Sequence, residues 1–115
     1  MDPDCIFCQI IAGQIPAKLV YQNEHVTAFH DIKPVTPVHV LIIPNRHIDS
    51  LAELQPEDAD VVGHVLTIAQ RIAETVGVAE TGYRLSFNLG RDAGMAVHHL
   101  HAHLMGGRRL GWPPG

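Results

Sequence analysis

The sequence lacks the marks of several protein classes. It has no run of about 18 apolar residues, which a membrane-spanning helix would need. Its 8 basic residues stand against 12 acidic ones, for a net charge of −4, and this excludes the broad basic face of a nucleic-acid-binding protein. The acidic start Met1–Asp4 does not have the basic-then-apolar plan of a signal peptide. We therefore expect a cytoplasmic protein with no membrane and no nucleic-acid partner.

Cysteine is also scarce, with only Cys5 and Cys8. In the cytoplasm such a pair is expected to be reduced rather than joined in a disulfide. No internal repeat or low-complexity linker interrupts the chain. Its 115 residues, 46% of them hydrophobic, are enough for one globular domain with its own core, and we expect it to span residues 1–115.

The apolar pattern predicts an α+β fold. Short turns separate most of the β-rich segments and only one long helix intervenes, which favours an antiparallel five-stranded sheet with that helix and a short N-terminal helix. In the long helix the stripe Val62, Leu66, Ala69, Ile72 (or Ala73) and Val76 is expected to face the core, and Gly77 to end the helix. The expected helices are 5–12 and 56–76, and the expected strands 19–21, 26–30, 38–43, 83–88 and 97–105.

Histidine is the abundant functional residue. His99, His101 and His103 alternate with Leu100 and Ala102. In a strand, successive side chains point to opposite faces, so this alternation predicts three imidazoles in a row above an apolar underside.

Imidazole can act as nucleophile, acid, base or metal ligand near neutral pH. The central His101 is therefore a candidate nucleophile toward phosphorus, with His99 and His103 to bind phosphate oxygens or pass a proton. The plain alternative is a histidine-rich tract that only binds metal. The glycines of the preceding loop, Gly90 and Gly94, would let main-chain amides approach a phosphate.

These residues give the chain a close resemblance to the histidine triad (HIT) family, and within it to the purine nucleoside phosphoramidase branch. The alternating triad is the specific signature, and the match extends over nearly the whole chain. The other segments that resemble the family are Asp4–Ile11, Ala28–Asp31, Pro37–Pro44 and the ending from Gly106-Gly107 to Trp112-Pro113-Pro114-Gly115.

The resemblance implies a HIT-like fold and a two-step hydrolysis. His101 would attack the α-phosphorus of a nucleoside monophosphate ester or amide, and water would then release the monophosphate from a nucleotidyl-histidine intermediate. His103 would contact the phosphoryl group and the leaving group, and His39 would support the triad. Histidine rather than glutamine at position 103 favours hydrolysis over transfer.

The resemblance also implies the nucleotide contacts. Asp31, which follows His30, would bind the ribose hydroxyls, while Asn88 and the backbone of Gly94, Met95 and Ala96 would hold the phosphate. The branch usually has glutamine and then serine or threonine where Met95 and Ala96 stand, so an amide and a hydroxyl that would bind phosphate are missing. The purine would lie against Ile6, Phe7, Ile10, Ile15 and Phe29, although such residues also form ordinary cores.

The Cys5-x-x-Cys8 spacing fits half of a tetrahedral zinc site. The resemblance implies that His47 and His99 complete it as a closed structural zinc site, which would remove His99 from acid–base work while the chemistry itself needs no metal. Two buried thiols or a redox pair are the alternatives.

The leading hypothesis is a phosphoramidase that cleaves the P–N bond of purine nucleoside phosphoramidates or aminoacyl adenylates and releases AMP or GMP. The rivals are a dinucleoside polyphosphate hydrolase, a zinc-stabilised nucleotide-binding or scaffold protein with little turnover, and a cysteine-based redox or metal-handling module. The resemblance further implies a homodimer in which the Trp112 tail lies near the partner's active site.

Overall fold

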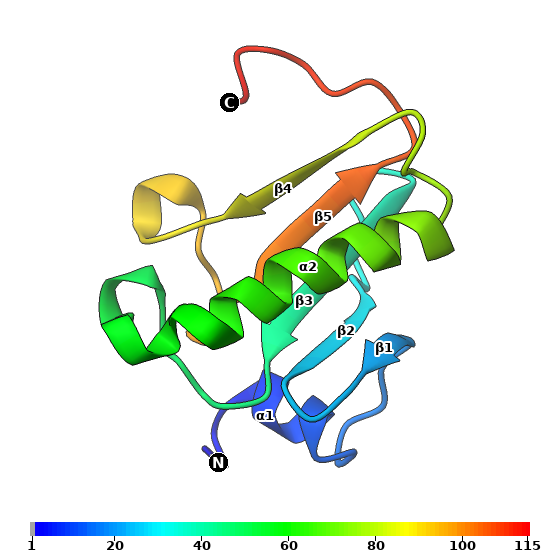
Figure 1. The fold of residues 1–115 in the computed structure, drawn as a ribbon. Helices are drawn as coiled ribbons and strands as arrows, with labels where there is room; N and C mark the ends of the chain where they lie inside the picture. The colour runs from blue at the N-terminus through cyan, green and yellow to red at the C-terminus, as the bar shows by residue number, and fades with distance from the viewer. Residues whose placement is uncertain (1) are drawn as a thin grey trace.

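The computed structural model describes residues 2–115 and shows one antiparallel sheet with a helix on each face (Figure 1). The strand order is β1-β2-β3-β5-β4, and every neighbouring pair is antiparallel. The α+β prediction, with one long and one short helix, is confirmed. The strands are β1 (Leu19–Gln22), β2 (Val26–His30), β3 (Val38–Pro44), β4 (Tyr83–Phe87) and β5 (Ala102–Gly106), and the helices α1 (Ile6–Ile11) and α2 (Ala59–Thr75).

The long helix α2 lies across one face of the sheet (Figure 1). There it packs on Val40 and Ile42 of β3 and on Ala102 and Leu104 of β5. The predicted stripe is right in the second half of the helix, where Ala69, Ile72 and Ala73 are buried and Val76 packs against the core. It is wrong in the first half, where Leu66 is 48% exposed and the sheet instead buries Val65 and Ile68.

The ends of the long helix also differ from the prediction. Residues Pro56–Asp58 form a separate 3-10 turn, and α2 begins at Ala59. Asp58 is buried there and pairs with Arg46, so the turn is tied to the segment after β3. At the other end Gly77 has φ +82°, which only glycine adopts without strain, and the helix stops as expected.

The short helix α1 covers the opposite face of the sheet. Phe7 and Ile10 pack against Phe29 of β2 and against Leu41 and Ile43 of β3. In β3, alternation places Val40 and Ile42 under α2 and Leu41 and Ile43 under α1, so both faces of this central strand are buried. The chemistry-bearing residues gather on the α1 side.

The histidine strand is shorter than predicted. Residues 97–105 were expected to form one strand, but β5 begins only at Ala102. The ladder with β3 ends at the pair Ile42 and Ala102. Two residues further along β3 stands Pro44, which has no N–H to donate, and the Leu100 amide donates instead to the carbonyl of Ile48. His99 and His101 therefore lie in an irregular segment, and only His103 is in the strand.

No helix among residues 2–115 is both long and apolar enough to cross a membrane.

Candidate functional site

Three imidazoles lie on the α1 side of the sheet at the junction of β3 and β5. His103 of β5 pairs with Leu41, and His39 lies two residues before Leu41, so both side chains point to the same face. His39 Nε2 lies 3.0 Å from His103 Nδ1. The rings of His101 and His103 are 4.9 Å apart between centroids.

The proton on His39 can be placed from its partners. Its Nδ1 lies 3.2 Å from the main-chain N–H of Val35, which can only donate, so Nδ1 must accept. In the neutral ring the proton is then on Nε2, which faces His103 Nδ1 and lies 3.6 Å from Asp31 Oδ2. His103 Nδ1 consequently accepts, and neutral His103 carries its own proton on Nε2.

The same reasoning fixes His101. Its Nδ1 lies 2.7 Å from the carbonyl oxygen of His99, and a carbonyl can only accept. Neutral His101 therefore carries its proton on Nδ1 and a lone pair on Nε2. An imidazole with one nitrogen held by a carbonyl and the other free is oriented as a nucleophile. Phe7 packs edge-on against this ring at 5.3 Å and restricts its motion.

Burial keeps the rings of His39 and His103 neutral. It lowers the pKa of His103 to about 4, and the neighbouring His101 and His39 contribute to the same shift. Burial also lowers the pKa of His39, against the opposing pull of the Asp31 carboxylate. His39 and His103 thus act as neutral hydrogen-bonding groups at neutral pH, and the tautomers assigned above apply.

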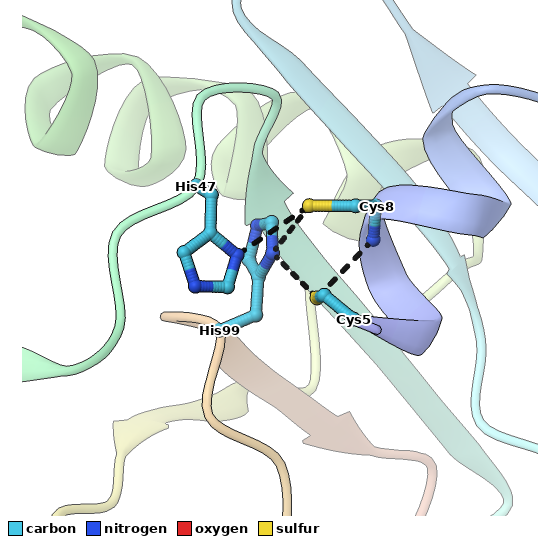
Figure 2. Close-up of side chains that lie close together, drawn as sticks. All are labelled: Cys5, Cys8, His47 and His99. Carbon is cyan, nitrogen blue, oxygen red and sulfur yellow. Dashed lines mark hydrogen bonds between the residues drawn. The ribbon is translucent and has the colours of Figure 1, made fainter. Parts of the chain in front are cut away.

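A second cluster lies beside His101, includes the triad residue His99, and joins α1 to two loops (Figure 2). Cys5 and Cys8 come from the start of α1, His47 from the segment after β3, and His99 from the segment before β5. One ligand atom from each lies within 4.8 Å of every other. Cys5 Sγ is 3.3 Å and Cys8 Sγ 3.6 Å from His99 Nδ1, and Cys8 Sγ is 3.4 Å from His47 Nδ1. This cluster could hold a metal ion.

The two histidines of this cluster have the tautomer that a metal requires. His99 Nε2 donates to the carbonyl of Pro44 at 2.8 Å, and His47 Nε2 faces Asp49 Oδ1 at 3.1 Å. Each ring therefore presents an Nδ1 lone pair to the thiols, with its second nitrogen held by an oxygen, as in protein metal sites. Burial lowers the pKa of His99 to about 4 and raises the pKa of the Cys5 thiol.

Similarity to known proteins agrees with this geometry. The family model of the HIT domain matches residues 12–110. The chain belongs to the HIT family. It is 47% identical to the purine nucleoside phosphoramidase of Escherichia coli (strain K12) over 111 residues, which cover 96% of this chain and 93% of that protein.

Solved HIT structures share the fold. A HIT family hydrolase from Legionella pneumophila aligns with a TM-score of 0.95 and 42% identity, over 97% of this chain and all of that one. A histidine triad nucleotide-binding protein from Candida albicans aligns with a TM-score of 0.82 and 32% identity, over 96% of this chain and 83% of that one.

Two of the expected nucleotide contacts, His30 and Asp31, line an open groove. The groove has a volume of about 740 Å³ and includes His30, Asp31 and His39 in its wall, next to the triad. Of the expected purine wall, Phe7, Ile10 and Phe29 are buried in the core under α1, Ile15 is partly buried against it, and Ile6 is 47% exposed. Ile6 and Ile15 thus have more surface to offer a base than the three core residues.

The loop that was expected to bind phosphate, Gly90–Ala96, offers fewer free amides than expected. The Gly94 amide donates to the carbonyl of Arg91 and the Met95 amide to that of Gly90. These two bonds close the loop on itself, so Ala96 is the member of the expected set whose amide is not used inside it. Asn88 follows the end of β4, one residue past Phe87, which pairs with Ala102.

Sequence reasoning missed the groups that orient the histidines. The carbonyls of Pro44 and His99 and the amide of Val35 are main-chain atoms, and no side-chain pattern announces them. Asp49 could have been predicted as the partner of His47, because it lies only two residues further along the chain. His25 and His64, both partly exposed, stack with centroids 4.0 Å apart.

Proposed function

We propose that this chain is a purine nucleoside phosphoramidase that cleaves the P–N bond of nucleoside 5′-phosphoramidates, or the P–O bond of aminoacyl adenylates, and releases AMP or GMP. The observation that carries the proposal is the free Nε2 lone pair of His101, fixed by the bond from Nδ1 to the carbonyl of His99, with the Nε2–H of His103 beside it. The relative in Escherichia coli that is named for this activity supports the choice of reaction.

In the first step on a phosphoramidate, His101 Nε2 attacks the α-phosphorus, an N–P bond to His101 forms, and the P–N bond to the amine breaks. On an aminoacyl adenylate the bond that breaks is P–O, and the amino acid leaves as its carboxylate. The amine leaves with one proton taken from solvent, because His103 is held neutral. The Nε2–H of His103 donates to the phosphoryl oxygen on which charge develops. The positive charge that forms on the His101 ring is stabilised through Nδ1–H by the carbonyl of His99.

In the second step water attacks the phosphorus and the bond to His101 breaks, which releases the nucleoside monophosphate and returns one proton to solvent. During both steps we propose that Asp31, beside His30 in the groove, binds the ribose hydroxyls, and that Asn88 and the Ala96 amide bind the phosphate. No step requires a metal ion.

The test is release of AMP from an adenosine phosphoramidate. His101→Ala should lower kcat by roughly 1,000-fold or more, as for loss of a nucleophile, whereas the surface variant His64→Ala should keep the full rate. Trapping of a nucleotidyl-histidine in the parent chain would identify the intermediate. Unchanged AMP release by His101→Ala would refute the mechanism.

The rival functions predict different results in the same assay. A dinucleoside polyphosphate hydrolase would turn over that substrate faster than the phosphoramidate. A nucleotide-binding protein with little turnover would bind AMP tightly and form no phosphohistidine. A cysteine-based redox or metal-handling module would lose its function in Cys5→Ser and keep it in His101→Ala.

We further propose that the ion held by Cys5, Cys8, His47 and His99 is a structural zinc. Zn–S and Zn–N bonds of about 2.3 and 2.0 Å in a tetrahedron put sulfur and nitrogen about 3.5 Å apart. The observed separations are 3.3, 3.4 and 3.6 Å. Zinc would join α1 to the segment after β3 and the segment before β5, and would fix His99, whose carbonyl holds His101. Reduced thiols are needed for this role, which supports a cytoplasmic location.

We also propose that residues 1–115 act as one domain and that two chains form a homodimer with the Trp112 tail near the partner's active site. Trp112 is 83% exposed and Leu66, on the outer side of α2, 48%. Within residues 2–115 the strand β4 is an edge of the sheet with no neighbour on its outer side. Sedimentation would show a dimer. Trp112→Ala would change the preference among leaving groups without changing the mass of the sedimenting dimer.

A further inference from the structure

We propose that a clamp formed by Gly107 and Arg108 holds the loop Val35–Pro37 (the 35–37 loop) as a positioning device for the triad, so that the Val35 amide fixes the tautomer of His39 and thereby that of His103. This inference deepens the proposed function, on which it rests for its kinetic consequences. The tautomers themselves can be measured without any activity.

The first part of the device is the contact between the loop and His39. The Val35 amide donates to His39 Nδ1 at 3.2 Å, and the His39 Nε2 proton faces His103 Nδ1 at 3.0 Å. His39 is 5% exposed, so solvent has little access to replace a displaced amide. Asp31 Oδ2, 3.6 Å from His39 Nε2, favours the same placement of the proton.

The second part is the clamp that holds the loop. The chain leaves β5 through Gly107, which has φ +90° and lies against Pro37. A Cβ on Gly107 would come within 2.9 Å of Pro37 Cβ, closer than side chains tolerate, so only glycine lets the two segments pack this tightly. Next to it the Arg108 guanidinium donates to the Val35 carbonyl at 3.3 Å. The loop is thus held at Val35, between Arg108 and His39.

The clamp matters because His103 has two neutral forms and only one suits the reaction. With the His39 proton on Nε2, His103 presents Nε2–H to a phosphoryl oxygen. If the Val35 amide moves away, the His39 proton can shift to Nδ1, and His39 Nε2 then becomes an acceptor. His103 in turn moves its proton to Nδ1 and presents a lone pair to the anionic phosphate, which weakens binding of the transition state.

The experiment reads the tautomers directly by ¹⁵N NMR of histidine-labelled protein without substrate. In the parent chain His103 should show a protonated Nε2 and an unprotonated Nδ1, and His39 the same. Gly107→Ala, with its Cβ against Pro37, should give a mixture of tautomers at both rings and lower kcat for AMP release about tenfold with little change in KM. Arg108→Ala should give the same effects in weaker form, and Arg108→Lys, which keeps a donor for the Val35 carbonyl, should restore the parent behaviour.

The controls are neighbouring positions outside the clamp. A Cβ on Gly111 would meet no described atom within 4 Å, and this glycine has no positive φ. The hydrogen bonds that the 35–37 loop makes within residues 2–115 include Arg108 but not the Arg109 side chain. Gly111→Ala and Arg109→Ala should therefore match the parent chain. Arg108→Ala, a surface change, keeps the test valid even where Gly107→Ala fails to fold.

Two results would overturn the proposal. One is a parent chain in which His103 carries its proton on Nδ1. The other is a pair of folded variants, Gly107→Ala and Arg108→Ala, whose tautomers and kcat match those of their controls. Failure of the proposed function looks different, because a parent chain with the expected tautomers and no phosphoramidase activity would leave the clamp intact and refute only the reaction.

Discussion

Metal removal gives the most direct stability test of the Cys5, Cys8, His47 and His99 cluster. A ligand that binds only the folded state stabilises it by RT ln(1 + [L]/Kd), which is about 4 kcal/mol when free metal exceeds Kd a thousandfold. For 115 residues, an unfolding entropy of about 2.1 cal/mol/K per residue gives about 0.24 kcal/mol/K. Adding excess EDTA to the zinc-loaded protein should therefore lower Tm by roughly 17 °C.

The variant Cys5→Ser separates the metal from the helix cap. Cys5 Sγ also accepts the Cys8 amide at 3.3 Å and so caps α1, a task that a serine hydroxyl performs well. With zinc, Cys5→Ser should melt well below the parent chain, because it loses one ligand. In EDTA the two should melt within a few degrees of each other.

The measurement is thermal unfolding of both chains with and without EDTA, with zinc content determined by elemental analysis and His64→Ala as the histidine control outside the cluster. The reasoning would be refuted by a parent chain whose Tm ignores EDTA, or by a Cys5→Ser deficit of equal size in EDTA. The second result would mean that the thiol acts through packing alone.

Protonation, helix glycines and the phosphate loop each give a further test. Stability should fall as pH drops from about 6.5 to 4, because His103 has a folded pKa of about 4 and an unfolded one near 6.5, so the unfolded chain binds more protons in that window. After discounting for solvent exposure, His103 contributes about 1 kcal/mol to this loss. Urea unfolding of His103→Gln should therefore show a free energy of unfolding that depends less steeply on pH. Gly63→Ala, in mid-helix with nothing within 4 Å, should stabilise by about 0.5–1 kcal/mol, whereas Gly77→Ala, at φ +82°, should destabilise by about 1 kcal/mol or more; equal effects would refute the glycine analysis. The double variant Met95→Gln/Ala96→Ser should raise kcat/KM for the phosphoramidate about tenfold, the value of one hydrogen bond to a charged group, and an unchanged value would show that main-chain amides already suffice.

Most of the fold could be predicted from the sequence, because the apolar patterns of its strands and of its long helix are both strong. The strand 26–30 was predicted with the bounds that the structure shows, and the β-branched run at 38–43 gave the central strand to within one residue. The buried residues in the second half of α2 were predicted, but those in its first half were not, because Leu66 and Val65 are equally good core residues until the position of the sheet is known. Packing against the sheet decides between two such neighbours, and sequence periodicity alone does not.

The residues of the site could be predicted from the sequence, but the orientation of their rings could not. The pattern of alternating histidines and the Cys5-x-x-Cys8 spacing identified the first side chains, and the resemblance added His39 and His47. What determines how these rings act is a set of main-chain groups: the Val35 amide and the carbonyls of Pro44 and His99. Every residue has such groups, so their placement follows from the folded path of the chain and leaves no mark in the sequence.

The early end of the histidine strand shows why this matters for chemistry. Had β5 continued through His99, the carbonyl of His99 would have been committed to the sheet ladder. By leaving the ladder at Ala102, the chain frees that carbonyl for His101 Nδ1. This local departure from the predicted strand therefore orients the proposed nucleophile, while the ring of the same His99 lies against Cys5 and Cys8. A chain with a regular strand here would keep its three histidines but not the contact that places the His101 lone pair on Nε2, on which the proposed reaction depends.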